Sequence, residues 1–211
     1  MQKAMLLHAS LAAGVAATAW SDALLQALPY ARRLQLERAD AATRSASLGG
    51  LALALAGASR LAGTVPRVDE FRFASGAKPR LAYGPGFSVS HTAGRVACVV
   101  CTAGEIGLDI ERVRTDAGPA TLHELWRWTA TEAALKAAGL GLRQVQAVVI
   151  DKSPLGASVH GRRYALREVL LSSQVIGHLA STEPVELIVE CVDLDGSEVS
   201  TAVQRALGLA A

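Results

Sequence analysis

The spacing of apolar residues changes from a helical period to a strand period near residue 87, and this change limits the folds that the sequence can adopt. From Ser21 to Leu61, leucines recur at helical spacing among alanines, and Pro29 is expected to separate two helices. A looser stretch from Ala62 to Gly86 follows, rich in glycine and proline. From Phe87 to His91 apolar and polar residues alternate, as they do in a strand with one buried face. A helical region is therefore followed by a region of strands.

The rest of the chain continues mainly as short strands. Ile106 to Glu111 alternates as Phe87 to His91 does, and a short helix is expected from Thr129 to Ala138. Further extended runs are predicted at Val145 to Ile150, Arg163 to Leu171, Val175 to Leu179 and Val185 to Val192, with a closing helix at Ser197 to Leu207. Helices and strands are mixed without the regular alternation of a doubly wound parallel sheet, so the predicted fold class is α+β.

Composition and charge exclude several classes of protein. Of the 211 residues, 51% are apolar and 19% are charged, which is typical of a compact globular chain and not of a disordered one. The formal net charge is only +2 and the basic residues are scattered, so no nucleic-acid partner is predicted. The apolar stretch after Lys3 is interrupted by His8 and Ser10 and is expected to be a first strand or helix, not a signal peptide. Leu48 to Ala58 is too short to span a bilayer, and no membrane partner is predicted.

The cysteines indicate a reducing compartment. Their number is three, which is odd and far below the density of a disulfide-stapled secreted domain, so a cytoplasmic location is expected. Cys98 and Cys101 have the C-x-x-C spacing but lie in the apolar run Val96 to Cys101, which is typical of a buried strand. An odd offset in a strand directs two side chains to opposite faces, so this pair is expected neither to form a disulfide nor to bind a metal ion.

Two carboxylates stand two residues apart in the predicted strand from Ile106 to Glu111. Asp109 and Glu111 would project from the same face, with their origins about 7 Å apart, which is close enough to share one hard cation. A solvated polar face would place them in the same way. Taken alone, the pair therefore leaves both interpretations open.

A third acid and a lysine follow in the predicted helix. Glu132 and Lys136 lie at positions i and i+4, on one side of it, and could form an ordinary ion pair. A capping box between Thr129 and Glu132 would also explain the glutamate. His91 and Lys78, the latter in the turn Gly76-Ala77-Lys78-Pro79, can each contact a ligand or simply meet water.

Three ordered segments together resemble the signatures of the Sfp-type phosphopantetheinyl transferases. They are Phe87-Ser88-Val89-Ser90-His91-Thr92, Ile106-Gly107-Leu108-Asp109-Ile110-Glu111, and Trp128-Thr129-Ala130-Thr131-Glu132-Ala133-Ala134-Leu135-Lys136 with the following Ala137 to Leu142. The turn Lys78-Pro79 before the first segment also matches, and weaker similarity extends from about Arg32 to about Ser181.

The resemblance implies an α+β fold of two halves related by a pseudo-twofold axis, each a long helix packed on a small antiparallel sheet. The halves would be residues 1–103, which contact the nucleotide end of coenzyme A, and residues 104–211, which carry the magnesium site. The implied site roles are Asp109, Glu111 and Glu132 for Mg²⁺, Glu132 and Lys136 for catalysis, and Lys78, Ser90, His91 and Arg44 for coenzyme A.

The implied activity is transfer of the 4'-phosphopantetheine arm of coenzyme A to a serine of an acyl, aryl or peptidyl carrier protein. A monomer is expected, because the cleft lies within one chain.

The segment Arg112 to Thr131 is shorter than in most relatives, and Thr131 replaces a basic residue. These departures favour the alternative of a non-catalytic homologue that binds coenzyme A or a carrier protein. An unrelated magnesium phosphohydrolase would leave the Ser90-His91 signature unexplained.

Overall fold

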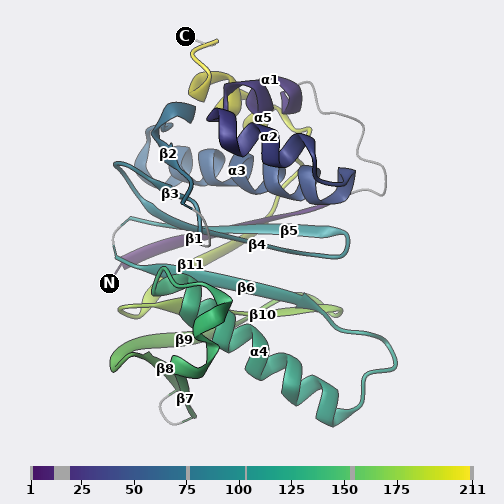
Figure 1. The fold of residues 1–211 in the computed structure, drawn as a ribbon, viewed down its shortest axis with the longest axis vertical. Coiled ribbons are helices and arrows are strands. Elements are labelled where there is room, and N and C mark those ends of the chain that lie inside the picture. The colour runs from purple at the N-terminus through teal and green to yellow at the C-terminus, as the bar shows by residue number, and fades with distance from the viewer. Residues whose placement is uncertain (1, 12–19, 75–76, 103, 153–154, 210–211) are drawn as a thin grey trace.

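The computed structural model describes residues 2–11, 20–74, 77–102, 104–152 and 155–209, and these form four layers (Figure 1). The first layer is helical and contains α1 (Ser21–Ala27), α2 (Tyr30–Glu37), α3 (Ala41–Ala62) and α5 (Ser197–Ala206). Two sheets form the middle layers, and α4 (Pro119–Ala137) forms the fourth. The class is therefore α+β, as the sequence predicts.

The first sheet has the strand order β11-β1-β5-β4. Its strands are β1 (Gln2–Ser10), β4 (Gly86–Thr92), β5 (Arg95–Cys101) and β11 (Val185–Cys191). β5 pairs antiparallel with both β1 and β4, whereas β11 lies parallel to β1. The apolar stretch near the N-terminus is thus an inner strand up to Ser10, hydrogen-bonded on both sides, and its later residues 12–19 lie outside the described residues.

The second sheet is antiparallel throughout, in the order β6-β10-β9-β8-β7. Its strands are β6 (Ile106–Arg112), β7 (Val148–Lys152), β8 (Leu155–Val159), β9 (Arg162–Ser172) and β10 (Val175–Ser181). Short elements connect the layers: the 3-10 helices η1 (Val68–Glu70) and η2 (Leu142–Ala147) and the hairpin of β2 (Phe71–Arg72) and β3 (Arg80–Leu81).

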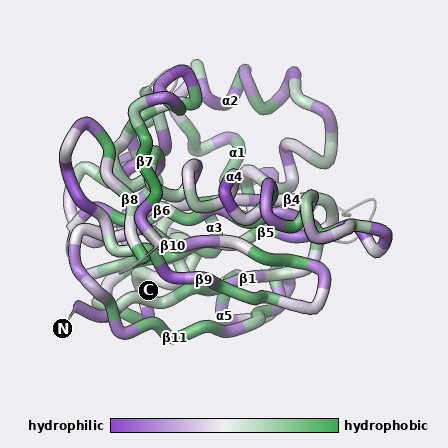
Figure 2. The backbone as a smooth tube through the Cα atoms, turned by 90° about the horizontal axis from the view of Figure 1, so that it is seen from below, coloured by the Kyte–Doolittle hydropathy of each residue, from purple (hydrophilic) through white to green (hydrophobic). Residues whose placement is uncertain are grey.

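Apolar residues fill each interface between the layers. Leu7 and Cys98 pack beneath α3, whereas Leu6 and Cys101 pack between the two sheets. A third cluster lies between the second sheet and α4. Cys98 and Cys101 therefore point to opposite faces of β5, as predicted. The helix α2 contributes little to these clusters. Its residues alternate between hydrophilic and hydrophobic in Figure 2, and Leu36 is its one buried residue.

The long helix α3 is a core helix. By length and composition it could cross a membrane, but 67% of its apolar window is buried inside the structure. It begins after Asp40, whose side chain accepts a hydrogen bond from the Thr43 backbone N–H at 2.8 Å, and it ends at Gly63, whose φ is 69°. Asp40 thus begins a new helix, so the region from Ser21 to Leu61 holds three helices where two were predicted.

The helix α4 differs from its prediction. It begins at Pro119 and not at Thr129, so Thr129 lies inside the helix. The Thr129 hydroxyl lies 3.1 Å from the backbone carbonyls of Leu125 and Trp126, so the alternative of a capping box with Glu132 is excluded. The extended run predicted from Val145 is also wrong in part, because the chain is a 3-10 helix up to Ala147.

The C-terminal elements return to the first sheet. β11 pairs with β1, and α5 packs against α3. Arg60 of α3 forms ion pairs with Glu190 of β11 and Glu198 of α5. The predicted division into 1–103 and 104–211 is therefore not a division between the sheets, and Ala103 itself lies outside the described residues.

The contact between α4 and β6 depends on Gly107. A Cβ atom at this position would meet the backbone of Ala133, Lys136 and Ala137. We expect Gly107→Ala to lower the free energy of unfolding by about 3 kcal/mol, because the helix must move away from the strand. Urea denaturation measures this change. Gly118→Ala is the matched control, because a Cβ there meets nothing within 4 Å and should cost under about 1 kcal/mol. Equal losses in both variants would contradict the close-packing explanation.

Candidate active site

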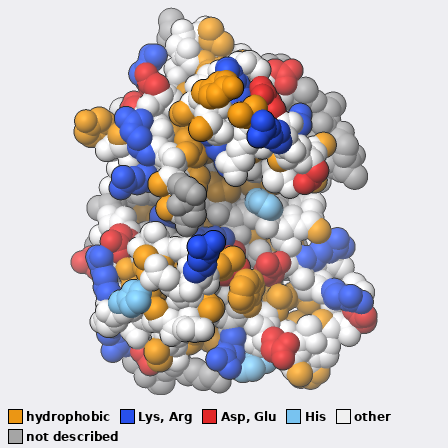
Figure 3. Space-filling view, in the orientation of Figure 1, with side chains coloured by type: hydrophobic (Ala, Val, Ile, Leu, Met, Phe, Trp, Pro, Cys, Tyr) orange, Lys and Arg blue, Asp and Glu red, His pale blue; other side chains and the backbone are white. Residues whose placement is uncertain are grey.

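A cavity of about 980 Å³ lies between the edges of the two sheets and the C-terminal half of α4. Its lining includes seven of the eight predicted site residues: Lys78, Ser90, His91, Asp109, Glu111, Glu132 and Lys136. Figure 3 shows this face of the molecule hollowed across its middle, with acidic, basic and histidine side chains around the hollow. Residues far apart in sequence thus share one solvent-accessible space.

Side-chain hydroxyls join the two sheets beside this cavity. β4 and β6 are edge strands of separate sheets, and they lie side by side. The hydroxyl oxygens of Ser88, Ser90 and Thr92 accept hydrogen bonds from the backbone N–H groups of Leu108, Ile110 and Arg112, at 3.1, 3.2 and 3.1 Å. Each hydroxyl occupies the place of a carbonyl in a strand ladder, so the alternating polar residues of β4 fix its register against β6.

Asp109 is the most buried acid of the site, with 3% of its surface exposed. Its Oδ1 accepts hydrogen bonds from the Ser90 hydroxyl at 2.9 Å and from the Lys136 ammonium at 2.6 Å. Its Oδ2 is buried without a hydrogen-bond partner among the described residues. A buried acceptor without a donor is costly, so this oxygen favours a bound cation.

Lys136 compensates the buried negative charge. Its ammonium lies 2.6 Å from Asp109 and 3.5 Å from Glu132, one turn earlier in α4. Burial and the charge of Asp109 raise the pKa of Glu132 above its ordinary value. Burial and Asp109 likewise raise the pKa of Glu111. The arrangement is one of mutually repelling acids held together around a lysine, which is a common feature of functional sites.

Lys78 and His91 add hydrogen-bond donors to the wall of the cavity. Lys78 donates a hydrogen bond to the backbone carbonyl of Ile106, and burial lowers the pKa of its ammonium to about 8. His91 is an exposed residue of β4, but partial burial of its ring and then the charge of Lys136 lower its pKa. Both groups can donate hydrogen bonds to an anionic ligand in the cavity.

The acids have the chemistry of a magnesium site without forming a closed cluster. Carboxylate oxygens are the ligands that Mg²⁺ uses in proteins, and three carboxylates line the cavity. Within the described residues, however, no three His, Cys, Asp or Glu side chains are grouped closely enough to hold a metal ion as they lie. The ammonium of Lys136 stands between Asp109 and Glu132 instead. The partnerless Asp109 Oδ2 is the observation that fits a cation.

The prediction for Arg44 is wrong, because this residue does not line the cavity. Its guanidinium donates hydrogen bonds to the backbone carbonyls of Leu36, Glu37 and Ala39, at 2.9 to 3.1 Å. These carbonyls end α2, where a positive charge and extra donors are stabilising. Arg44 thus holds α2 against α3 and lies apart from the other predicted site residues.

Sequence reasoning missed Ser88, Thr92 and His178. The alternation of polar residues through Thr92 was the available signal for the two hydroxyls. His178 lies opposite Asp109 in the β6–β10 pair, and its Nδ1 is 2.8 Å from the Thr129 hydroxyl. Because that hydroxyl donates to a helix carbonyl, it accepts a hydrogen bond from Nδ1–H. The Nε2 atom is buried and has no hydrogen-bond partner among the described residues.

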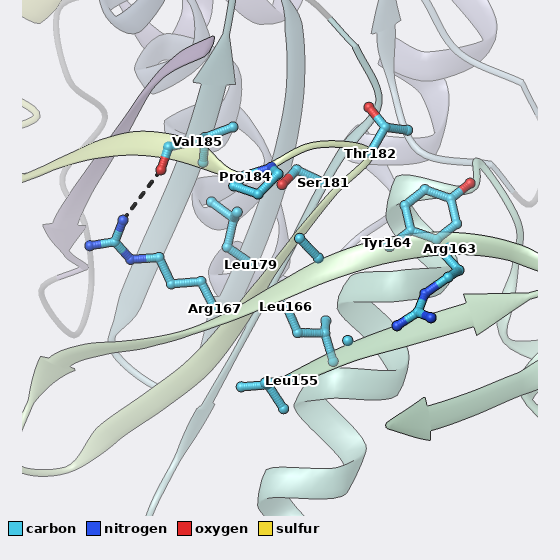
Figure 4. Close-up of a pocket in the computed structure, with 12 residues that line it drawn as sticks. Leu155, Arg163, Tyr164, Leu166, Arg167, Leu179, Ser181, Thr182, Pro184 and Val185 are labelled. Carbon is cyan, nitrogen blue, oxygen red and sulfur yellow. Dashed lines mark hydrogen bonds between the residues drawn. The ribbon is translucent and has the colours of Figure 1, made fainter. Parts of the chain in front are cut away.

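A second cavity, of about 490 Å³, opens between β9 and the start of β11 and carries different chemistry. Figure 4 shows Leu155, Leu166 and Leu179 between Arg163 and Arg167, with the Arg167 guanidinium 3.4 Å from the carbonyl oxygen of Val185. None of the described residues that line it carries a carboxylate. It is therefore not the acidic site.

Comparison with known proteins adds no assignment: no protein-family model matches this chain, and no curated protein matches it. The residues of the cavity are therefore the guide to function.

The buried histidine makes stability depend on pH. Burial lowers the pKa of His178 to about 4, despite the opposing charge of Glu168, whereas the unfolded chain keeps the ordinary 6.5. The unfolded state then binds more protons between these values, so the contribution of His178 is complete above pH 6.5 and is lost as pH falls towards 4. Between pH 7 and 4.5 we expect the free energy of unfolding of the natural protein to fall by about 2–3 kcal/mol more than that of His178→Phe. Urea denaturation at both pH values tests this, and parallel pH profiles would contradict it.

Proposed function

We propose that this protein is a phosphopantetheinyl transferase that moves the 4'-phosphopantetheine arm of coenzyme A to a serine of a carrier protein. The observation that carries the proposal is the meeting of seven predicted residues in one cavity. They come from the Lys78 turn and from the three signature segments, which the chain brings together from three layers of the fold. A chance resemblance in sequence would not require these segments to converge.

The architecture supports the same proposal. α3 packs on the antiparallel strands β1, β5 and β4, and α4 packs on the antiparallel strands β6, β10 and β9. We interpret these units as the two pseudo-twofold halves of the transferase fold, with β11 and α5 added to the first. The cavity lies where the halves meet, at β4 and β6, which is where a cleft ligand would contact both.

The cavity suits coenzyme A and magnesium. Its volume of about 980 Å³ lies at the upper end of the range of small-molecule sites. Asp109, Glu111 and Glu132 would hold Mg²⁺, which when bound would neutralise charge on the pyrophosphate. Lys78 and His91 would hold the nucleotide end. Ser90 also lines the cavity, and its hydroxyl donates a hydrogen bond to Asp109.

The chemistry requires one bond to form and one to break. The hydroxyl oxygen of the carrier serine attacks the β-phosphorus of coenzyme A, and the bond to the bridging oxygen breaks, so that adenosine 3',5'-bisphosphate leaves. Glu132, on the cavity wall, accepts the hydroxyl proton directly or through water. Lys136 supplies positive charge beside the phosphate oxygens, where negative charge develops. Positioning and electrostatics carry the rest of the rate enhancement.

A transfer assay tests the activity. The protein is incubated with coenzyme A, Mg²⁺ and several unmodified carrier proteins of different pathways, and the carriers are weighed by mass spectrometry. We expect addition of the phosphopantetheine arm, and a loss of rate of roughly 100-fold or more in Asp109→Asn, because a buried charge of the site is removed. Asp116→Asn is the control, since Asp116 pairs with Arg114 on an exposed loop outside the cavity and its loss should leave the rate unchanged.

The other outcomes distinguish the alternatives. Magnesium-dependent binding of coenzyme A without transfer to any carrier would contradict the activity and support a non-catalytic binding homologue. Phosphate release without a carrier would instead indicate a phosphohydrolase.

A further inference from the structure

Two hydroxyls of β4 each make two contacts with β6, one to its backbone and one to a carboxylate. Ser90 accepts from the Ile110 N–H and donates to Asp109, at 3.2 and 2.9 Å. Thr92 accepts from the Arg112 N–H and donates to Glu111 Oε2, at 3.1 and 3.3 Å. In both cases the carboxylate belongs to the residue directly before the N–H donor.

This double contact leaves no freedom in the direction of the hydroxyl proton. A hydroxyl carries one proton, and the backbone N–H occupies a lone pair of its oxygen, so the proton is available for the carboxylate. The Thr92 proton therefore engages Oε2 of Glu111 and leaves Oε1 outside this bond. On Asp109 the Ser90 hydroxyl engages Oδ1, so Oδ2 is the oxygen outside this bond. This Oδ2 is buried without a partner among the described residues. The hydroxyls thus select which carboxylate oxygens remain for a ligand.

Ser88 shows what the hydroxyls do in the absence of an acid. Its oxygen accepts from the Leu108 N–H at 3.1 Å, in the same register as the other two. The residue before Leu108 is Gly107, which has no side chain to receive the proton. Ser88 therefore contributes the connection between the sheets without the contact to a carboxylate, and it separates the two roles experimentally.

We propose that Thr92 is a positioning residue of the cation site: its hydroxyl fixes the Glu111 carboxylate in the orientation that binds the metal ion, as Ser90 does for Asp109. This inference depends on the magnesium site of the proposed function and extends it to a residue with no assigned role. Hydrogen bonds to the ligands of a metal ion typically contribute 10- to 100-fold to its affinity. Because Thr92 is partly exposed and lies at the end of β4, its contribution should be near the lower limit.

Binding of Mn²⁺ alone to the full-length protein, followed by electron paramagnetic resonance without coenzyme A or carrier, tests the proposal. Thr92→Val removes the hydroxyl and keeps the shape of the side chain, and we expect it to weaken Mn²⁺ binding about 10-fold. Thr92→Ser, which restores the hydroxyl, should bind within about twofold of the natural protein. Ser88→Ala loses an equivalent bond to the backbone and should leave the affinity unchanged. Circular dichroism verifies folding, and Thr92→Ala replaces the valine variant if that variant does not fold.

Natural affinity in Thr92→Val, or an equal loss in Ser88→Ala, would overturn the positioning role. The Mn²⁺ measurement and the transferase assay test the two proposals independently. Mn²⁺ binding with the expected variant pattern but no transfer would reject the proposed function alone, whereas transfer with unchanged affinity in Thr92→Val would reject the positioning role alone. Absence of Mn²⁺ binding by the natural protein would reject both.

Discussion

The hydrogen bonds between β4 hydroxyls and β6 backbone N–H groups are the constraint on which the site depends. β4 and β6 are edges of different sheets, and edge strands have unpaired backbone groups that need partners. Ser88, Ser90 and Thr92 supply the acceptors at alternate positions. A shift of one residue would turn these hydroxyls away from β6 and would expose the apolar face of β4. These bonds join the sheets, and Ser90 and Thr92, which also donate to the carboxylates, additionally fix Asp109 and Glu111.

The close contact of α4 with β6 is the second requirement. Gly107 and the alanines of α4 bring the helix backbone near the strand, so the Lys136 ammonium reaches Asp109. Bulkier residues in this interface would separate the lysine from the acid. A buried carboxylate without a counter-charge would then be protonated or would destabilise the fold. Packing of small residues is thus what allows charged groups to gather at the junction of the two sheets.

Most elements could be predicted from local pattern, and the failures have physical causes. Residues 87–91 and 106–111 alternate strictly, and both lie within strands of the structure. The first half of α4 was missed because Pro119 to Trp128 has no clear apolar stripe, although proline in the first turn is a recognised start of a helix. Arg44 was misassigned because a basic residue on a helix can cap its neighbour or bind a ligand, and only the path of α2 decides between them.

The sequence by itself determined the α+β class, the two acids on one face of a strand, and the pairing of Glu132 with Lys136 on one side of a helix. These features follow from the periods of strands and helices, which depend only on local backbone geometry. The tertiary structure decided which strand edges meet, that β11 returns to β1, and that Ser90, Thr92 and Lys136 converge on the acids of β6. Such contacts join residues distant in the chain, and they form only where burial of all layers fixes the relative positions of the elements.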